Sequence, residues 1–387
     1  MKGNGEYKFL SSHKFCLDFQ KSIKHLFTQI FRNSYSKGIL MLKKSFFAIT
    51  FFTLTSVSLY SQTVISKYAG EFMAIGVGAR ALGMGGAYVA IANDVTSGYY
   101  NPAGLANLNY PQIALMHAEQ FGNLVNYDYG SVAIPFGTDM TFGISAMRLA
   151  VDGIPDTRDA LVIRNTTTRL NDINDPRAGI NADLVTEFSD QDWAFYLTFA
   201  KRQAENFYYG VNVKIIKRDI AEYNAFGVGF DVGALYTPYE NLFIGANLQD
   251  VTTTLVAWNT GRNELISPTA KIGAAYMVEF FGGKLTPAFD LDVRFENRRF
   301  ASNFNIGPVS FDMHAGLEYN FQNLFAIRGG YNDVKQFTLG AGVKLPKLNI
   351  DYSFARFNYS KNERLDDTHR ISIILTLEES RFLRKGL

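Results

Sequence analysis

Histidines are the residues that could most directly support catalysis, and the sequence has three of them beyond residue 61. His117, His314 and His369 are far apart, and no HExxH or GxSxG motif is present. Ser310 and His314 share one face of a predicted strand, but four residues of strand separate them by about 13 Å. That distance is too long for the hydrogen bond of a nucleophile and its base. The sequence therefore predicts a protein that is not an enzyme.

A glycine motif offers a second kind of chemistry. Gly76-x-Gly78-x-x-Ala81 matches part of a dinucleotide-binding fingerprint. That fingerprint requires a preceding strand and a following helix within a βαβ unit, and the sequence predicts neither. We therefore reject nucleotide binding and expect no cofactor.

The polar segment 151–191 is rich in oxygen ligands, which could bind calcium. Its stretch Asp172-Ile-Asn-Asp-Pro lacks the alternating ligands and the glycine of a calcium loop. We expect a solvated loop that faces a partner, and no metal site. Its acidic and amide residues are Asp172, Asn174, Asp175, Asp183, Glu187 and Asp190.

The first 61 residues are expected to be removed or spurious. Residues 41–61 combine two lysines, an apolar stretch and a small residue before Gln62, which is typical of a signal peptide. A single membrane anchor is the alternative, but the apolar run is short and contains Ser and Thr. We interpret residues 1–40 as an upstream extension created by a start codon assigned too early, or as a cytoplasmic extension.

Removing this segment changes the charge. Nine of the 38 Lys and Arg residues and two of the 36 Asp and Glu residues precede Gln62, so the remainder has a net charge of about −5. It also loses Cys16, the only cysteine. An exported, mildly acidic chain is a poor partner for nucleic acid and cannot form disulfides.

Beyond residue 110 the hydrophobic residues alternate with a period of two, which predicts strands. In the segment 310–319, Phe311, Met313 and Leu317 share one face, whereas Asp312 and Glu318 share the other. Ten residues tilted by about 40° span roughly 25 Å, the height of an outer-membrane apolar band.

Fourteen segments follow this pattern. They lie near residues 111–118, 127–136, 139–150, 192–202, 206–218, 225–237, 241–249, 269–281, 284–295, 310–319, 323–331, 335–345, 347–357 and 368–378. Short turns such as 137–138 alternate with long loops such as 151–191 and 250–268, as in bacterial barrels.

We therefore predict an all-β fold: an antiparallel transmembrane β-barrel of about 14 strands at 107–378, with a short tail at 379–387, in the outer membrane of a Gram-negative cell. A soluble β-sandwich or propeller would use the same alternation. Export and the aromatic residues near the turns favour the barrel, because they fit interfacial girdles. These aromatics are Phe136, Tyr236, Phe243, Phe280, Phe281, Tyr319 and Phe321.

The glycine-rich segment 62–106 precedes the first barrel strand. Its glycines indicate close approach of backbones, and Asn93-Asp94 could cap a short helix that ends near Pro102. We expect it to fold into the lumen as a hatch. Its motif residues are Gly76, Gly78, Arg80, Gly83, Gly85, Gly86, Asn93, Asp94, Asn101, Pro102 and Ala103.

This head resembles the PorV/PorQ family of outer-membrane barrels of Bacteroidota, which are related in fold to the FadL fatty-acid transporters. The resemblance rests on residues 69–106, from Ala69-Gly-Glu-Phe to Tyr100-Asn-Pro-Ala-Gly-Leu-Ala106. It implies a fourteen-stranded barrel with a hatch and a role in type IX secretion, in which such barrels receive exported proteins at the cell surface.

The polar face of the strands should line the lumen. It carries six acids and five bases: Lys214, Asp231, Asp290, Asp292, Arg294, Asp312, Glu318, Arg328, Lys344, Asp351 and Arg370. Such a balance favours ion pairs that fix the hatch over a selectivity device. The strands show no apolar track through the lumen, which leaves an entry pocket near the outer loops or the hatch as the alternative.

Three functions follow from these features. The first is a surface barrel that binds a secretion translocon or exported proteins through its outer loops. The alternative is FadL-like uptake of a hydrophobic small molecule, and the third is a purely structural protein surrounded by outer-membrane lipid.

Overall fold

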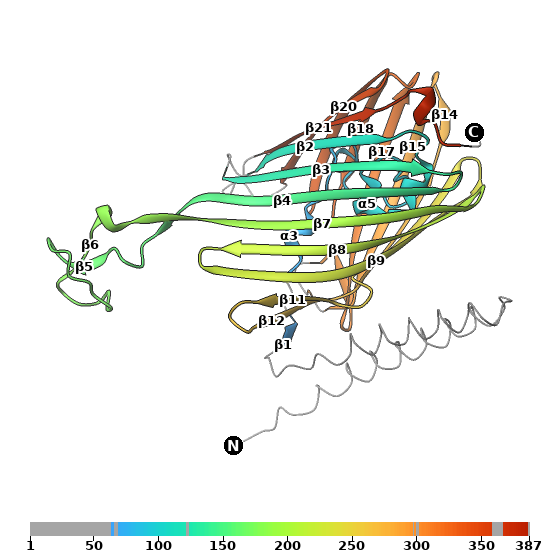
Figure 1. The fold of residues 1–387 in the computed structure, drawn as a ribbon. Coiled ribbons are helices and arrows are strands. Elements are labelled where there is room, and N and C mark those ends of the chain that lie inside the picture. The colour runs from blue at the N-terminus through green and yellow to red at the C-terminus, as the bar shows by residue number, and fades with distance from the viewer. Residues whose placement is uncertain are drawn as a thin grey trace, which may run out of the picture. The chain divides into compact units, whose positions relative to one another are not determined.

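The computed structural model describes residues 63–65, 69–120, 124–296, 298, 302–357 and 367–385. The predicted upstream extension and signal peptide lie outside this range. The described part of the chain is a closed antiparallel barrel with 14 strand positions and a hatch inside it (Figure 1).

The barrel strands follow one another round the wall in chain order. They are β2 (Gln112–Gln120), β3 (Val125–Phe136), β4 (Met140–Asp156), β7 (Thr186–Ala204), β8 (Phe207–Ile220), β9 (Tyr223–Tyr239), β10 (Leu242–Gln249), β13 (Thr269–Tyr276) with its continuation β14 (Val278–Phe280), β15 (Gly283–Arg294), β17 (Val309–Phe321), β18 (Phe325–Tyr331), β19 (Gln336–Leu345), β20 (Leu348–Phe357) and β21 (Thr368–Thr376). The last strand pairs with β2, which closes the barrel.

The predicted strands are confirmed in number and place, but the outer loops contain more structure than the sequence predicted. Strands β4 and β7 continue beyond the barrel into the segment predicted as a loop, where β5 (Leu161–Ile163) and β6 (Ala178–Ile180) form a hairpin. We call residues 157–185 the arm; it projects to the left in Figure 1. The hairpin β11 (Thr254–Trp258) and β12 (Asn263–Ile266) extends the sheet beside β9.

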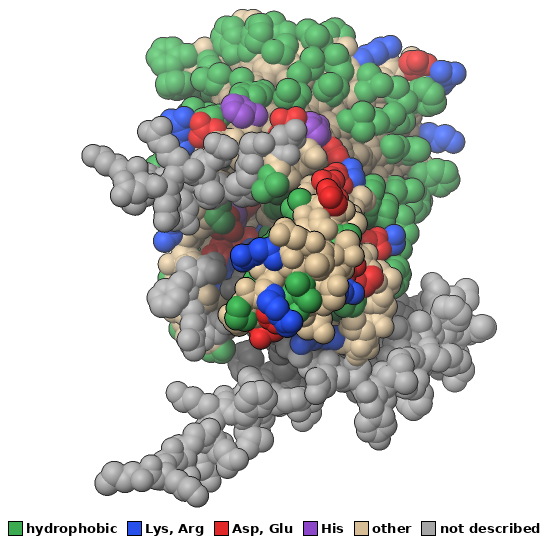
Figure 2. Space-filling view, turned by 90° about the vertical axis from the view of Figure 1, so that its left-hand side faces the viewer, with side chains coloured by type: hydrophobic (Ala, Val, Ile, Leu, Met, Phe, Trp, Pro, Cys, Tyr) green, Lys and Arg blue, Asp and Glu red, His purple; other side chains and the backbone are tan. Residues whose placement is uncertain are grey.

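Alternation along the strands sorts the side chains as a membrane barrel requires. On β17, Met313 and Leu317 are exposed on the outer wall, whereas Asp312 and Glu318 are buried inside. Hydrophobic side chains cover much of the wall in Figure 2, which looks onto the long-loop end. This outer face contacts membrane lipid.

Most of the predicted girdle aromatics are exposed near the short turns, as expected for Phe136, Tyr236, Phe280, Phe281 and Phe321. Phe243 is an exception. It lies on the inner face of β10 and packs against the buried core formed with the hatch. The prediction for Phe243 was wrong because proximity to a turn does not reveal on which face of the strand a residue lies.

The hatch runs lengthwise through the lumen. Strand β1 (Thr63–Ile65) pairs with β12 at the long-loop end. The chain then forms α3 (Glu71–Ala74), α4 (Ala79–Gly83), α5 (Ser97–Tyr100) and the 3-10 helix η2 (Pro102–Asn107), and reaches β2 at the short-turn end. The expected short helix therefore exists as α5, although its N-cap is Thr96; Asp94 instead accepts hydrogen bonds from the backbone and hydroxyl of Thr96.

Glycines on the inner wall let the hatch backbone lie directly against the strands. Gly316 pairs with Gly330 on the neighbouring strand, and an added Cβ at Gly316 would lie 2.5 Å from the carbonyl oxygen of Met84. Hatch residue Gly85 has a φ of +66° and would meet Tyr331 in the same way. Only glycine satisfies both the backbone angle and the close approach at this position.

This packing predicts different effects for two adjacent glycines of β18. Gly330→Ala places a methyl group on the backbone of Met84 and Gly85, whereas the outward-facing Gly329 meets nothing closer than 4.0 Å. We expect Gly330→Ala to lower the free energy of unfolding by about 1–3 kcal/mol, the usual range for overpacking. Thermal unfolding in detergent measures it, and an equal loss in Gly329→Ala would contradict the packing argument.

Candidate functional site

The main polar contact between hatch and wall is an arginine clamp. Arg80, on α4, donates from Nε and from a terminal nitrogen to the two carboxylate oxygens of Glu318 on β17, both at 2.9 Å. The same guanidinium donates to Tyr88 and Asn93 and lies 3.6 Å from the Asp94 carboxylate. A bidentate pair of this kind is both strong and directional, so it fixes the position of α4 against the wall.

The clamp continues into the wall as a chain of alternating charges. Arg328, on β18, donates from Nε to Glu318 at 2.6 Å and from a terminal nitrogen to Asp351 at 2.7 Å. Every member except Arg80 is buried. Because each buried charge has an opposite neighbour, the network can remain ionised inside the lumen.

Two further wall residues hold the hatch backbone. Asp290 accepts hydrogen bonds from the backbone N–H groups of Tyr88 and Val89, at 2.7 and 2.8 Å. His314 lies with Nδ1 2.8 Å from the carbonyl oxygen of Gly85. These contacts satisfy backbone groups that the irregular hatch leaves without a regular partner.

A second ionic group lies towards the long-loop end. Lys271 donates to Asp292 at 2.6 Å, and Arg294 lies 3.3 Å from Asp312. Glu71, on α3, accepts from Arg298 at 2.8 Å. The start of the hatch is therefore tied to the wall by charge, as its middle is by Arg80.

The third buried ionic group is confined to the wall. Lys214 lies 3.3 Å from Asp231 and 2.6 Å from Asp250. Asp231 also accepts from Asn212, whose amide donates to the carbonyl of Gly98 in the hatch. This group supports α5 indirectly.

All eleven residues predicted to line the lumen lie on the inner face, but they do not form one site. Nine belong to the groups above. Lys344 is exposed at the short-turn end, where it lines a cavity. Arg370 is buried, and it has no carboxylate partner among the described residues.

Residues of the hatch motif take several structural roles. Gly78 is the N-cap of α4, and the Asn101 side chain accepts from the backbone of Ala103 at the start of η2, where Pro102 is the first residue. The Asn101 amide also donates to the carbonyls of Val89 and Ala234. Gly76, Gly83 and Gly86 lie in contact with Tyr100, Gly340 and His314, respectively.

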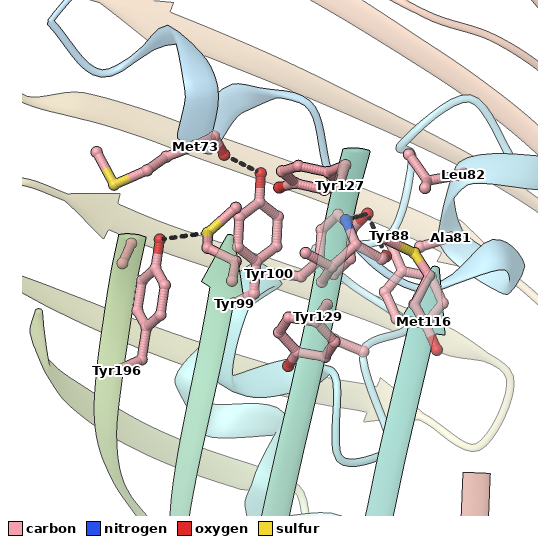
Figure 3. Close-up of a cluster of buried hydrophobic side chains, with 14 of the residues drawn as sticks. Met73, Ala81, Leu82, Tyr88, Tyr99, Tyr100, Met116, Tyr127, Tyr129 and Tyr196 are labelled. Atoms are coloured by element: carbon pink, nitrogen blue, oxygen red, sulfur yellow. Dashed lines mark hydrogen bonds between the residues drawn. The ribbon is translucent and has the colours of Figure 1, made fainter. Parts of the chain in front are cut away.

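The inward face of β2–β8 carries an apolar patch among buried polar residues such as Ser145, Thr198 and Lys214. We define the apolar wall by the buried inward residues of β2, β3, β4, β7 and β8: Met116, Tyr127, Tyr129, Met147, Ala194, Tyr196 and Ile216. They pack against Met73, Tyr99 and Tyr100 of the hatch (Figure 3). The absence of an open apolar track stays a prediction, because these side chains are buried against the hatch.

Hydrogen bonds orient several of these tyrosines. The Tyr99 hydroxyl donates to the carbonyl of Met73, and the Tyr100 hydroxyl donates to the carbonyl of Val77 at 2.8 Å. The rings of Tyr99 and Tyr100 meet edge to face with centroids 4.8 Å apart. Such an aromatic and thioether surface binds apolar molecules rather than ions.

A cavity of about 1000 Å³ opens at the short-turn end. The hatch forms one side of it through Arg80 and residues 90–94, and the strand ends form the rest, including Tyr208, Lys284 and Asn320. The clamp between Arg80 and Glu318 therefore separates this cavity from the remainder of the lumen.

The C-terminal tail fixes the end of the hatch. Arg384 donates to the carbonyls of Leu108, Ala106 and Met140 and to the Thr141 hydroxyl. Burial, together with the positive charge of Arg202, lowers the pKa of Arg384 to about 10. The residue stays charged at neutral pH, and its planar fork bridges η2 and β4.

The described residues show neither a metal-binding cluster nor a membrane-spanning helix. They contain no group of three or more His, Cys, Asp or Glu placed to hold a metal ion. Within the same ranges, no helix has both the length and the apolar character needed to cross a bilayer.

These features define a fourteen-stranded membrane barrel of the outer-membrane type, with an internal hatch. No family model and no curated protein matches the sequence, but solved structures share its fold. The toluene transporter TodX of Pseudomonas putida superposes with a TM-score of 0.52 at 12% identity, covering 78% of this chain and 97% of its own. The monoaromatic hydrocarbon channel CymD does so with a TM-score of 0.50 at 12% identity, covering 79% and 98%. A FadL homologue from Pseudomonas aeruginosa has a TM-score of 0.49 at 13% identity, covering 78% and 98%.

The clamp predicts that Arg80→Ala loosens the hatch without unfolding the barrel. Glu318 keeps its bond to Arg328. We therefore expect the free energy that holds the hatch against the wall to fall by about 1–3 kcal/mol, the cost of losing hydrogen bonds to a charged group. Hydrogen exchange of residues 76–101 should rise while the strands stay protected. Arg158→Ala, which removes an exposed loop pair with Asp156 and Glu222, is the control; equal exchange in both variants would contradict the clamp.

The tail predicts a contrast between two arginines only three residues apart. Arg384→Ala leaves buried carbonyls without a donor, and we expect it to lower the free energy of unfolding by about 2–3 kcal/mol. Arg381, whose side chain is 72% exposed beside Glu379, should tolerate alanine. The fraction of barrel that resists SDS before heating measures both, and equal resistance would show that Arg384 does not anchor η2.

Proposed function

We propose that this protein is an outer-membrane channel that takes up a hydrophobic small molecule through its lumen. The observation that carries the proposal is the apolar wall, which lines one side of an otherwise ionic lumen. Aromatic rings and methionine side chains give an apolar solute a path that the charged groups of β15–β20 do not offer. The proposal gives the chain no catalytic role.

The fold supports the same proposal. Two structures that share the fold are described as a toluene transporter and a monoaromatic hydrocarbon channel. In this chain the hatch occupies the lumen between the two ends, held by Arg80, Asp290 and Asn101. A plugged lumen excludes free diffusion of polar solutes, so passage requires movement of the hatch or binding along its apolar side.

Uptake assays test this function directly. Cells that express the full chain should accumulate toluene or a long-chain alkane faster than cells that lack it. Liposomes containing the protein should not swell in arabinose, because the hatch fills the lumen. Rapid swelling, or hydrocarbon uptake equal to that of cells without the protein, would exclude the proposal.

A pair of methionines provides matched variants. Met147→Gln places an amide in the apolar wall, where the side chain is fully buried, whereas Met313→Gln places it on the outer face, where Met313 is 39% exposed. We expect Met147→Gln to reduce hydrocarbon uptake about tenfold, since burying an amide whose neighbouring partner is the Tyr196 hydroxyl costs roughly 1–3 kcal/mol. Both variants are first checked for SDS resistance, and equal uptake by the two would remove the apolar wall from the path.

A second candidate function is the binding of protein partners at the cell surface, as in type IX secretion. The arm favours it, because β4 and β7 extend beyond the barrel to the hairpin of β5 and β6, whose connecting segment 164–177 presents exposed polar and charged side chains. Such an ordered projection suits a protein partner better than a small solute.

Deleting the arm separates the two functions. Joining the strands after Asp156 with a short turn should leave hydrocarbon uptake unchanged and abolish recovery of translocon components or exported proteins in a pull-down from outer membranes. A pull-down that recovers only lipid from the intact protein would exclude this second candidate.

A further inference from the structure

Two pieces of the chain meet at the long-loop end of the apolar core. One is α3 of the hatch, with Phe72 and Met73. The other is the hairpin β11–β12, whose inward residues Val256, Trp258 and Ile266 pack in the same apolar cluster. We call the contact between α3 and this hairpin the seam. Because the cluster continues into the apolar wall, the seam lies between that wall and the outside.

Arg218 of β8 joins the two sides of the seam. Its guanidinium lies 5.7 Å from the ring centroid of Phe72 and 5.5 Å from that of Trp258. Asp192 accepts from its Nε at 2.7 Å and from a terminal nitrogen at 2.8 Å, which fixes the plane of the guanidinium. A cation is attracted to the face of an aromatic ring, but each such contact is weak. Arg218 therefore works as a latch between the two rings.

The rest of the seam is an apolar contact. An added Cβ on Gly70 would lie 3.2 Å from Cγ2 of Ile266, on the hairpin. On its other side α3 is held more firmly, since Glu71 accepts a hydrogen bond from Arg298 at 2.8 Å. Apolar contacts do not demand one geometry, unlike bidentate ion pairs. The seam should therefore part more readily than the clamp at Arg80.

An irregular joint connects the hairpin to the barrel wall. Pairing with β9 stops at Leu248 of β10 and resumes at Leu255 of β11, where the register has shifted. Between them, Asp250 and Thr253 have φ of +53° and +62°, values that residues other than glycine seldom adopt. Asp250 itself is fixed by Lys214 at 2.6 Å. Strained joints are typical of switch regions, and this one allows the hairpin to bend beyond a fixed base.

We propose that the seam is the gate through which the hydrophobic molecule enters the lumen. The hairpin bends outward at the joint 250–253, Arg218 separates from one of its two rings, and the molecule passes between Phe72 and Trp258 to the apolar wall. Strand β1, which pairs with β12 (Figure 1), moves with the hairpin. The identity of the molecule rests on the proposed uptake function, whereas the gate is defined by the contacts of the seam.

A reversible disulfide across the seam tests the gate. Beyond residue 61 the sequence has no cysteine, so Gly70→Cys and Ile266→Cys together introduce a single pair of thiols there. Oxidation of this double variant should lower toluene uptake at least fivefold, and reduction should restore it. Each single variant should be insensitive to the oxidant. Unchanged uptake after oxidation, with the disulfide verified by mass spectrometry, would overturn the gate.

A buried thiol below the seam separates the gate from the uptake function. Ala194 is fully buried and pairs with Ile216, two residues deeper along the strands than Asp192 and Arg218. N-ethylmaleimide should label Ala194→Cys at least fivefold more slowly when the seam is locked than after reduction and removal of the reductant. Equal labelling would overturn the gate whatever the uptake result. Labelling that responds to the lock without any hydrocarbon uptake would support the gate and exclude the proposed function alone.

A matched pair of phenylalanines tests the latch. Phe72→Ala removes one ring from Arg218 and should speed labelling of Ala194→Cys about fivefold. Phe243 packs against the same apolar cluster from β10, near the short turns. Phe243→Ala therefore loosens the core without touching the seam and should leave the labelling rate unchanged. Equal acceleration in the two variants would show that general packing controls access, and would contradict the latch.

Discussion

Direct contact between the hatch backbone and the inner wall is the constraint on which the rest of the structure depends. It exists because glycines face inward where the two meet, as at the paired Gly210 and Gly233 and at the paired Gly316 and Gly330. With no Cβ at these positions, Pro102 and Met84 lie against the strands themselves. Asp290 of the wall can then accept hydrogen bonds from the hatch backbone, and Asn101 of the hatch can donate to the wall carbonyl of Ala234, without long side chains. The glycines make the close contact of hatch and wall sterically possible, and the ion pairs then fix the orientation of the hatch.

The lumen that results has two unlike sides. The strands β13 to β20 supply paired charges that hold the hatch, through Glu318 and Asp290. The strands β2 to β8 supply tyrosine and methionine, which pack against the same hatch beside a few directional bonds, such as that from Asn212 to the carbonyl of Gly98. Contacts of the second kind are easier to exchange for a bound solute, because dispersion and apolar burial do not demand one geometry. The division of holding and binding between the two sides is what makes an uptake role physically reasonable for a plugged barrel.

The sequence was sufficient to predict the strands of the barrel, but it was not sufficient to predict how the interior of the barrel is lined. Alternation identified all the membrane strands, since a period of two is a direct consequence of strand geometry. It also placed the eleven charged residues on the inner face. It did not reveal the apolar wall, because Met116 and Tyr127 alternate with residues that are themselves mixed, such as His117 and Asp128. On β2 and β3 the outward face is partly polar and the inward face is apolar, so the usual rule misleads there. The available signal was that on β2 and β3 the apolar residues occupy the inward positions and polar residues occupy the outward ones, the reverse of the other strands.

Pairings between hatch and wall could not be predicted either, because they join residues far apart in the chain, 238 positions apart for Arg80 with Glu318. The extensions of β4 and β7 were hidden for a different reason. Outside the membrane both faces of a strand are wet, so alternation disappears while the hydrogen-bonded ladder continues from Val151 to Asp156.

The course of the hatch from β1, paired with β12, to β2 has a consequence for biogenesis. A segment that enters a tube at one mouth and leaves at the other cannot be inserted sideways once the seam between β2 and β21 is zipped. The nascent barrel must therefore wrap around its own leading segment as an open, curved sheet. Pairing of β2 with β21 is then the last step, and it encloses the hatch that already lies inside the curved sheet.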